Sequence, residues 1–176
     1  KDGNAITIAR HVAQVARVAD ITARAHRHRV YVCTRELIRR LRDTHTIIAI
    51  SGSPEAAVRP FTAAWGFDQK LVFCSTAETV NGQYTGRRII GVVEDGKQRF
   101  VDACIATIPH ATLAHSIGVG DTEYDVSVLE RVAHPIAFNP TVALARIARA
   151  RGWRVVVERK DAIWVNGRLI TDIAAF

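Results

Sequence analysis

The sequence predicts an α/β fold built on a parallel sheet, and three observations support this prediction. Short apolar, β-branched runs alternate with stretches of helical periodicity along much of the chain. Two of these runs end at small or polar residues, Ser51 and Gly120. The 176 residues are 48% hydrophobic, which is enough apolar material for one buried core. We therefore expect one main domain with polar residues at the carboxyl ends of its strands.

The residue pattern of the first half of the chain predicts two helices, a short strand, a third helix, and then a second strand followed by a hairpin turn. Apolar residues recur at about helical spacing near the amino end, among Ala and Arg residues. Thr34 can cap a second helix, and Pro54 suits the first turn of a third. The expected elements are helices over 5–27, from Thr34 to Arg42 and from Pro54, strands over 46–50 and 70–75, and a hairpin turn at Asn81-Gly82.

The second half alternates strand and helix, which is the βαβ rhythm of a parallel sheet. Asn166-Gly167 joins the last two apolar runs and is a strong signal for a two-residue hairpin turn. The expected elements are a helix over 96–108, a strand from residue 115 with a helix after it, a strand over 134–138, a helix over 141–151, and strands over 154–158, 162–165 and 168–171.

Composition excludes several classes of protein. No window approaches the ~18 uninterrupted apolar residues of a membrane helix, and the amino end lacks the pattern of a secretory signal. Cys33, Cys74 and Cys104 are far apart and lie in apolar surroundings, which indicates reduced core thiols in a cytoplasmic protein. Residues 1–45 hold ten Lys or Arg against four acids, and so carry +6 of the net charge of +7.

The most informative stretch is the acidic turn after the strand that ends at Gly120. Asp121 and Asp125 stand four residues apart, with neither Cys nor His beside them. Carboxylate oxygens alone suit a hard cation such as Mg2+ better than zinc. The alternative is that Asp121 only caps the helix that follows.

Two further positions fit the handling of an anion. Ser51 opens Ser51-Gly52-Ser53-Pro54, where a hydroxyl and free backbone amides meet a helix start. Lys97 stands at the start of another helix, where its ammonium could reach an anion held near the cation. A hydroxyl, a lysine and a carboxylate pair are what phosphoryl transfer requires. The alternatives are a plain N-cap for Ser51 and a surface charge for Lys97.

These motifs resemble the haloacid-dehalogenase (HAD) superfamily of phosphatases, in particular its phosphoserine-phosphatase-like branch. The resemblance runs from about Val32 to the end of the chain. Its second motif is similar to Ser51-Gly52-Ser53-Pro54, its third to Gly96-Lys97, and its fourth to Gly120-Asp121 through Asp125. The resemblance implies a Rossmann-like core over 31–176 with a carboxyl-terminal hairpin, and a remnant of a helical cap over 1–30.

The resemblance also implies the chemistry. Such enzymes are magnesium-dependent hydrolases that act on a small phosphorylated metabolite through an aspartyl-phosphate. Here Ser51, Gly52, Ser53 and Lys97 would bind the substrate, and Ser51, Lys97 and Asp125 would serve catalysis. Asp121 would ligate Mg2+, and Asp125 would support the metal or orient Lys97.

Two departures from the family pattern limit this inference. The family's first motif, a DxDxT-like run whose leading Asp is the nucleophile, does not occur in this sequence. The chain also contains no Met and begins at Lys1, so we expect an amino-terminal truncation that has removed the nucleophile and the central first strand and leaves the fragment inactive. Within the fourth motif, Thr122-Glu123-Tyr124 replaces the usual Gly-Ala-Asn, so phosphoserine is not implied as the substrate.

Two alternative functions stay open. One is an inactive scaffold that binds phosphate without turning it over. The other is a nucleic-acid-binding module that uses the basic amino-terminal helix, although we do not expect this because no aromatic residues are interleaved through residues 1–30 to stack on bases. The sequence indicates neither the oligomeric state nor the identity of the substrate.

Overall fold

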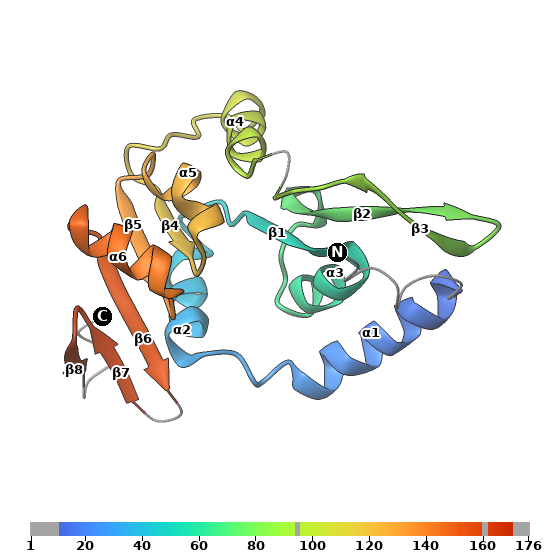
Figure 1. Cartoon of the computed structure of the whole chain (residues 1–176), viewed down its shortest axis with the longest axis horizontal. Coiled ribbons are helices and arrows are strands. Elements are labelled where there is room, and N and C mark those ends of the chain that lie inside the picture. Colours follow the sequence, from blue (N-terminus) through green and yellow to red (C-terminus); the bar gives the residue numbers. More distant parts are fainter. Residues whose placement is uncertain (1–10, 94–95, 160–161, 171–176) are drawn as a thin grey trace. The chain divides into compact units, whose positions relative to one another are not determined.

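The computed structural model describes residues 11–93, 96–159 and 162–170 (Figure 1). Its contacts divide the chain into two compact units. Unit 1 is Lys1–Val30 with Arg35–Asp95, and unit 2 is Tyr31–Thr34 with Gly96–Phe176. The division into 1–30 and 31–176 that the sequence suggests stays a prediction.

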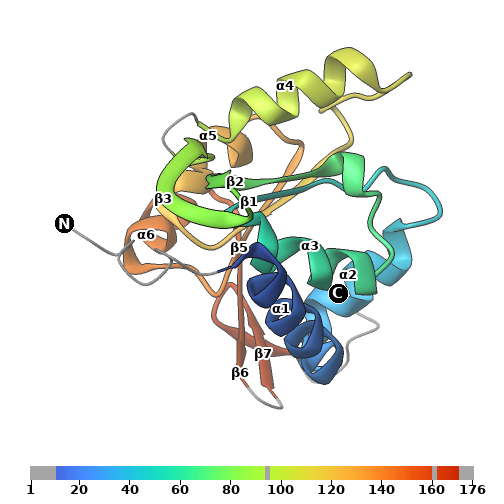
Figure 2. The same cartoon turned by 90° about the vertical axis from the view of Figure 1, so that its right-hand side faces the viewer.

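Unit 1 is a three-stranded sheet with helices packed beside it. The strand order is β1-β2-β3, with β1 and β2 parallel and β2 and β3 antiparallel. Helix α1 lies alongside α3, as Figure 2 shows. The elements are α1 (Val12–His26), α2 (Val32–Leu41), whose first residues belong to unit 2, β1 (Ala49–Pro54), α3 (Glu55–Ala64), η1 (Gln69–Leu71), β2 (Val72–Val80) and β3 (Gln83–Ile90).

The hairpin expected at Asn81-Gly82 is confirmed. Both residues have positive φ, 50° and 74°, as a turn of type I′ requires. The turn also meets the start of α1, because the Val12 amide donates to the Gly82 carbonyl at 2.9 Å. At the other end of α1, the Trp65 indole donates to the Arg27 carbonyl at 3.2 Å. The long amphipathic helix is therefore attached to unit 1 at both of its ends.

The first strand begins and ends later than the expected range of 46–50. In the structure β1 begins at residue 49 and continues through Pro54, so Ser51 lies within the strand and not after it. The reason is the pairing with β2: Ser51 is opposite Cys74, and a bulge then brings Pro54 opposite Ser75. Because pairing with β2 continues through the bulge, β1 includes Ser51, Gly52 and Ser53, where the sequence predicts that the strand ends.

Unit 2 shows the expected βαβ rhythm and ends in the expected hairpin. Strands β4, β5 and β6 are parallel neighbours, and β7 and β8 extend the sheet in antiparallel fashion through the Asn166-Gly167 turn. The elements are α4 (Gln98–Thr107), β4 (Ile117–Gly120), η2 (Glu123–Asp125), α5 (Val126–Leu129), β5 (His134–Phe138), α6 (Val142–Ala150), β6 (Arg154–Arg159), β7 (Ala162–Val165) and β8 (Arg168–Ile170).

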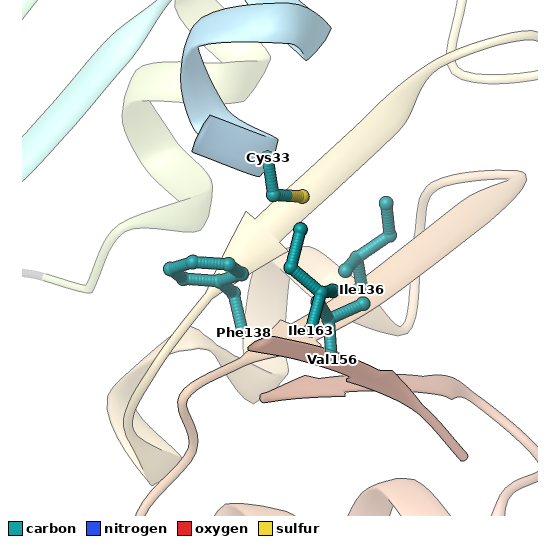
Figure 3. Packing of buried hydrophobic residues seen from close by; sticks show 5 residues of the cluster. All are labelled: Cys33, Ile136, Phe138, Val156 and Ile163. Atoms are coloured by element: carbon teal, nitrogen blue, oxygen red, sulfur yellow. The ribbon is translucent and has the colours of Figure 1, made fainter. Parts of the chain in front are cut away.

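Both faces of the central strands β5 and β6 are buried in unit 2. Alternate residues of β5 and β6 point to opposite faces, as strand geometry requires. One face carries Leu129, Leu144 and Ala148 from α5 and α6. The other carries the cluster in Figure 3, which is Cys33, Ile136, Phe138, Val156 and Ile163.

Cys33 brings the first turn of α2 into this core. The buried carboxylate of Glu158, on β6, accepts hydrogen bonds from the amides of Val32 and Cys33 at 2.6 and 2.9 Å. These amides are among the free donors of a helix start, so the carboxylate is hydrogen-bonded although it is buried. The α/β fold with parallel strands and flanking helices is confirmed, whereas a missing central strand stays a prediction.

Among the described ranges, no helix is both long enough and apolar enough to cross a bilayer.

Candidate functional site

The acidic turn, residues 121–125, is joined to Lys97 by an ion pair between Lys97 and Asp125. The Lys97 ammonium is 2.5 Å from Oδ1 of Asp125, and the two side chains are only 12% and 10% exposed. Lys97 precedes α4 as its N-cap residue, and Asp125 ends the short helix η2. Burial makes the attraction between these two charges much stronger than at the surface, provided that both stay paired.

The second oxygen of Asp125 holds the turn itself. Oδ2 accepts from the amides of Asp121 and Thr122 at 2.9 and 3.0 Å, and from the Thr122 hydroxyl at 3.3 Å. Thr122 and Asp125 together form a capping box, in which each side chain bonds the other residue's backbone. Both carboxylate oxygens are therefore engaged inside the protein, and a direct metal bond from Asp125 stays a prediction.

Asp121 is the carboxylate that is left available. It is exposed, and within the described ranges its side chain makes no hydrogen bond or ion pair. Its position directly after β4, at the carboxyl end of a parallel strand, is where α/β sheets bind ligands. One oxygen-donor carboxylate fits Mg2+, which commonly uses one or two carboxylates and completes its coordination with phosphate and water.

Gly120 allows the turn to fold back on the strand. A Cβ atom at this position would lie 2.4 Å from the Cβ of Asp125 and 2.7 Å from its Cγ, which no side chain can tolerate. The Asp125 carboxylate thus reaches the amide of Asp121 only because residue 120 is glycine.

A second loop also contacts the turn. Thr141 lies between β5 and α6, and its amide donates to the carbonyl of Asp121 at 2.8 Å. Its hydroxyl donates to the carboxylate of Glu123 at 3.0 Å. No sequence signal identifies this contact, because Thr141 and the acidic turn meet only when β4 and β5 pair.

The predicted anion-binding residues Ser51, Gly52 and Ser53 lie in unit 1. The Ser51 hydroxyl accepts from the Ser53 amide at 3.2 Å, while Gly52 and Ser53 are exposed. A Cβ at Gly52 would lie 2.7 Å from a methyl group of Val93. Burial raises the pKa of the neighbouring Cys74 thiol, which keeps it protonated and adds no negative charge beside Ser51.

The structure thus brings Lys97, Asp125 and the Asp121 turn together in unit 2. Ser51 belongs to unit 1, and its proximity to the other three residues stays a prediction. A cluster of three or more His, Cys, Asp or Glu side chains suited to a metal does not occur in the described part of the chain. The capping-box pattern Thr-x-x-Asp is the sequence signal that could have revealed how Asp125 holds the turn.

Comparison with protein families gives one match. A family model described as haloacid dehalogenase-like hydrolase matches residues 5–130, which is more than half of the chain. A search of curated proteins found no match.

Several solved structures are similar to this chain. A protein of unknown function from Bordetella pertussis Tohama I is 29% identical with a TM-score of 0.61, and the match covers 72% of this chain and 57% of that one. A phosphoserine phosphatase, solved as an analogue of the phospho-aspartyl intermediate, is 25% identical with a TM-score of 0.57 and the same coverage. A substrate-bound phosphoserine phosphatase complex is 26% identical with a TM-score of 0.54, covering 63% of this chain and 52% of that one. The chain spans less than two thirds of the length of each.

Proposed function

The chain belongs to the haloacid dehalogenase-like hydrolase family, and on this premise we propose that it is part of a magnesium-dependent phosphatase acting on a small phosphorylated metabolite. The observation that carries the proposal is the buried Lys97–Asp125 ion pair beside the free carboxylate of Asp121. The phosphoserine phosphatases among the similar structures support a phosphomonoester as the substrate class. Tyr124, where that branch usually has Asn, leaves the substrate's identity open.

Each residue has a distinct task in this proposal. Asp125 holds Lys97 in one position, so that the ammonium balances the charge of the phosphoryl group without having to reorganise. Asp121 would hold the cation, and a bound Mg2+ would neutralise charge on the phosphate oxygens. Ser51 would donate a hydrogen bond from its hydroxyl to the phosphoryl group.

The nucleophile is the part that this sequence does not supply, because no DxDxT-like run occurs in it. We expect the 176-residue chain to release no significant phosphate from an aryl phosphate in the presence of Mg2+. Robust magnesium-dependent release by the purified chain would contradict this expectation.

The site residues can be tested in a longer protein that joins this chain to a segment with the first motif. Asp121→Asn should abolish magnesium-dependent phosphate release, because a neutral amide replaces the charge that holds the ion. Lys97→Ala should lower turnover by ~100-fold or more, as loss of other charge-stabilising groups does. Glu130→Ala, which removes an exposed ion pair with Arg151 in the same unit, is the matched control and should keep wild-type turnover. Near-normal rates for either site variant would mean that the motifs are misplaced.

A phosphate-binding scaffold, which would keep the anion site without turnover, is the second candidate. In that case the longer protein would bind inorganic phosphate with Mg2+ and release none from any phosphomonoester tested.

A further inference from the structure

The loop after β5 is connected to the acidic turn by two hydrogen bonds from one residue. The Thr141 amide reaches the backbone carbonyl of Asp121, and the Thr141 hydroxyl reaches the side chain of Glu123. The same hydroxyl oxygen accepts from the Leu144 amide at 3.2 Å and so caps α6. One threonine therefore links the start of a helix to both ends of the Asp121–Glu123 segment.

The position of Thr141 is itself fixed by the sheet. Asn139, two residues earlier, has a φ of 44°, and its side-chain oxygen accepts from the Glu158 amide on β6 at 2.9 Å. The Asn139 amide in turn donates to the Val156 carbonyl at 2.8 Å. The loop that presents Thr141 is thus bound to the neighbouring strand by two bonds and forms a firm support.

The acidic turn needs such support. Helices η2 and α5, which follow Asp121, contain only three and four residues, too few for a helix that is stable by itself. Asp125 holds the turn through the amides of Asp121 and Thr122, and Thr141 holds the same turn through the Asp121 carbonyl and the Glu123 carboxylate. With backbone groups bound on both sides, Asp121 can keep its exposed carboxylate at one place.

We propose that Thr141 and Glu123 form a latch that positions Asp121 for cation binding, with Thr141 as a positioning residue. The latch is an addition to the roles of Lys97 and Asp125, and its purpose rests on the proposed function. Glu123 acts here as a hydrogen-bond acceptor. The exposed position and negative charge of Glu123 do not by themselves indicate this role as an acceptor for Thr141.

Amide hydrogen exchange of the purified 176-residue chain, without metal or substrate, tests the latch. Exchange reports local opening. Glu123→Ala keeps the α6 cap and removes only the acceptor, so the amides of Asp121, Thr122 and Thr141 should exchange about threefold faster, as expected for losing one exposed hydrogen bond. Thr141→Val should give at least the same increase. Amides of β5 should be unaffected.

Conservative variants separate the hydrogen bond from charge and from general destabilisation. Glu123→Gln and Thr141→Ser keep an acceptor and a donor, so both should restore wild-type exchange at the three amides. Glu130→Ala, an exposed acid of the same unit, is the matched control and should change nothing at the turn.

Unchanged exchange in Glu123→Ala would overturn the proposal, and this variant decides the question if Thr141→Val fails to fold. Equal acceleration in Glu123→Gln and Glu123→Ala would also overturn it, since charge and not the hydrogen bond would then matter. Failure of the proposed function would appear instead as absent phosphate release in the longer protein, whatever the exchange rates.

Discussion

The two halves of the predicted site differ in how they are held. In unit 2 Lys97 and Asp125 are nearly buried, and Asp125 alone accepts four hydrogen bonds. In unit 1 the Ser51 segment is part of a strand, has one side-chain bond of 3.2 Å, and exposes Gly52 and Ser53. Buried charged groups must be paired, whereas an exposed hydroxyl or backbone amide can form its hydrogen bond with water until a ligand replaces the water.

The difference implies that the Lys97–Asp125 pair of unit 2 is organised before any ligand arrives, while the Ser51 segment of unit 1 is held by fewer side-chain bonds. Such preorganisation is what stabilises developing charge in a reaction at low cost. Substitutions in the two parts of the predicted site should therefore lower stability by unequal amounts, and the largest loss is expected at the ion pair.

The largest effect is expected from Lys97→Ala. It leaves the Asp125 carboxylate buried without its partner, so the free energy of unfolding in urea should fall by ~3 kcal/mol. Ser51→Ala, the matched change in unit 1, removes one weak acceptor and should cost less than ~1 kcal/mol. Similar losses for the two variants would contradict the contrast between the units.

The two glycines next to the site residues sharpen the comparison. Gly120→Ala drives a methyl group into Asp125 and must displace the carboxylate, which should cost ~2–3 kcal/mol of stability. Gly52→Ala meets only a methyl group of Val93 and should cost about 1 kcal/mol, as judged by thermal or urea unfolding.

A second substitution tells these clashes apart. Val93→Ala in the Gly52→Ala background should recover most of the lost stability, because it removes the atom that the new methyl group meets. If Val93→Ala restores no stability, the loss in Gly52→Ala comes from the Gly52 backbone and not from the contact with Val93.

The last effect concerns Cys33 and the dependence of stability on pH. Burial and the nearby Glu158 raise the pKa of the Cys33 thiol from 9.0 to about 11 in the folded state. The neutral thiol therefore stabilises the fold fully below pH 9, and this contribution is lost as pH rises through 11. Between pH 9 and pH 10 the loss should be about 1 kcal/mol.

Urea titrations of the wild type and Cys33→Ala at pH 8, 9 and 10 measure this contribution. The variant should start less stable because it loses packing, yet its stability should fall less steeply with pH. Identical slopes would assign the pH dependence to other groups.

Much of the fold could be predicted because its signals are local. Asn81-Gly82 and Asn166-Gly167 specify their hairpin turns by backbone conformation alone, and the strand over 134–138 was predicted with the bounds of β5. The strand containing Ser51 was misplaced because its end depends on pairing with β2, which is a long-range contact.

The candidate site shows the same contrast between local signals and long-range contacts. Residue type and spacing predict Asp121, Asp125 and Lys97 as site residues, which stays a prediction, and the contact between Lys97 and Asp125 agrees with one of the two roles expected for Asp125. Thr141 and Glu158 could not be found, because each acts through residues far away in the sequence. The sequence indicates the groups that carry charge, and the topology decides which groups hold them.

The most direct test of the central claim, that the Asp121 turn of unit 2 is a site for a hard cation, is paramagnetic line broadening by Mn2+. Mn2+ shares the oxygen preference of Mg2+ and reports weak binding through the amide resonances close to it. In the wild-type chain, amides of residues 120–125 should broaden first, and excess Mg2+ should reverse the effect. Asp121→Asn should abolish the broadening, and Glu130→Ala should not. Equal broadening in wild type and Asp121→Asn, or broadening elsewhere in the chain first, would contradict the account.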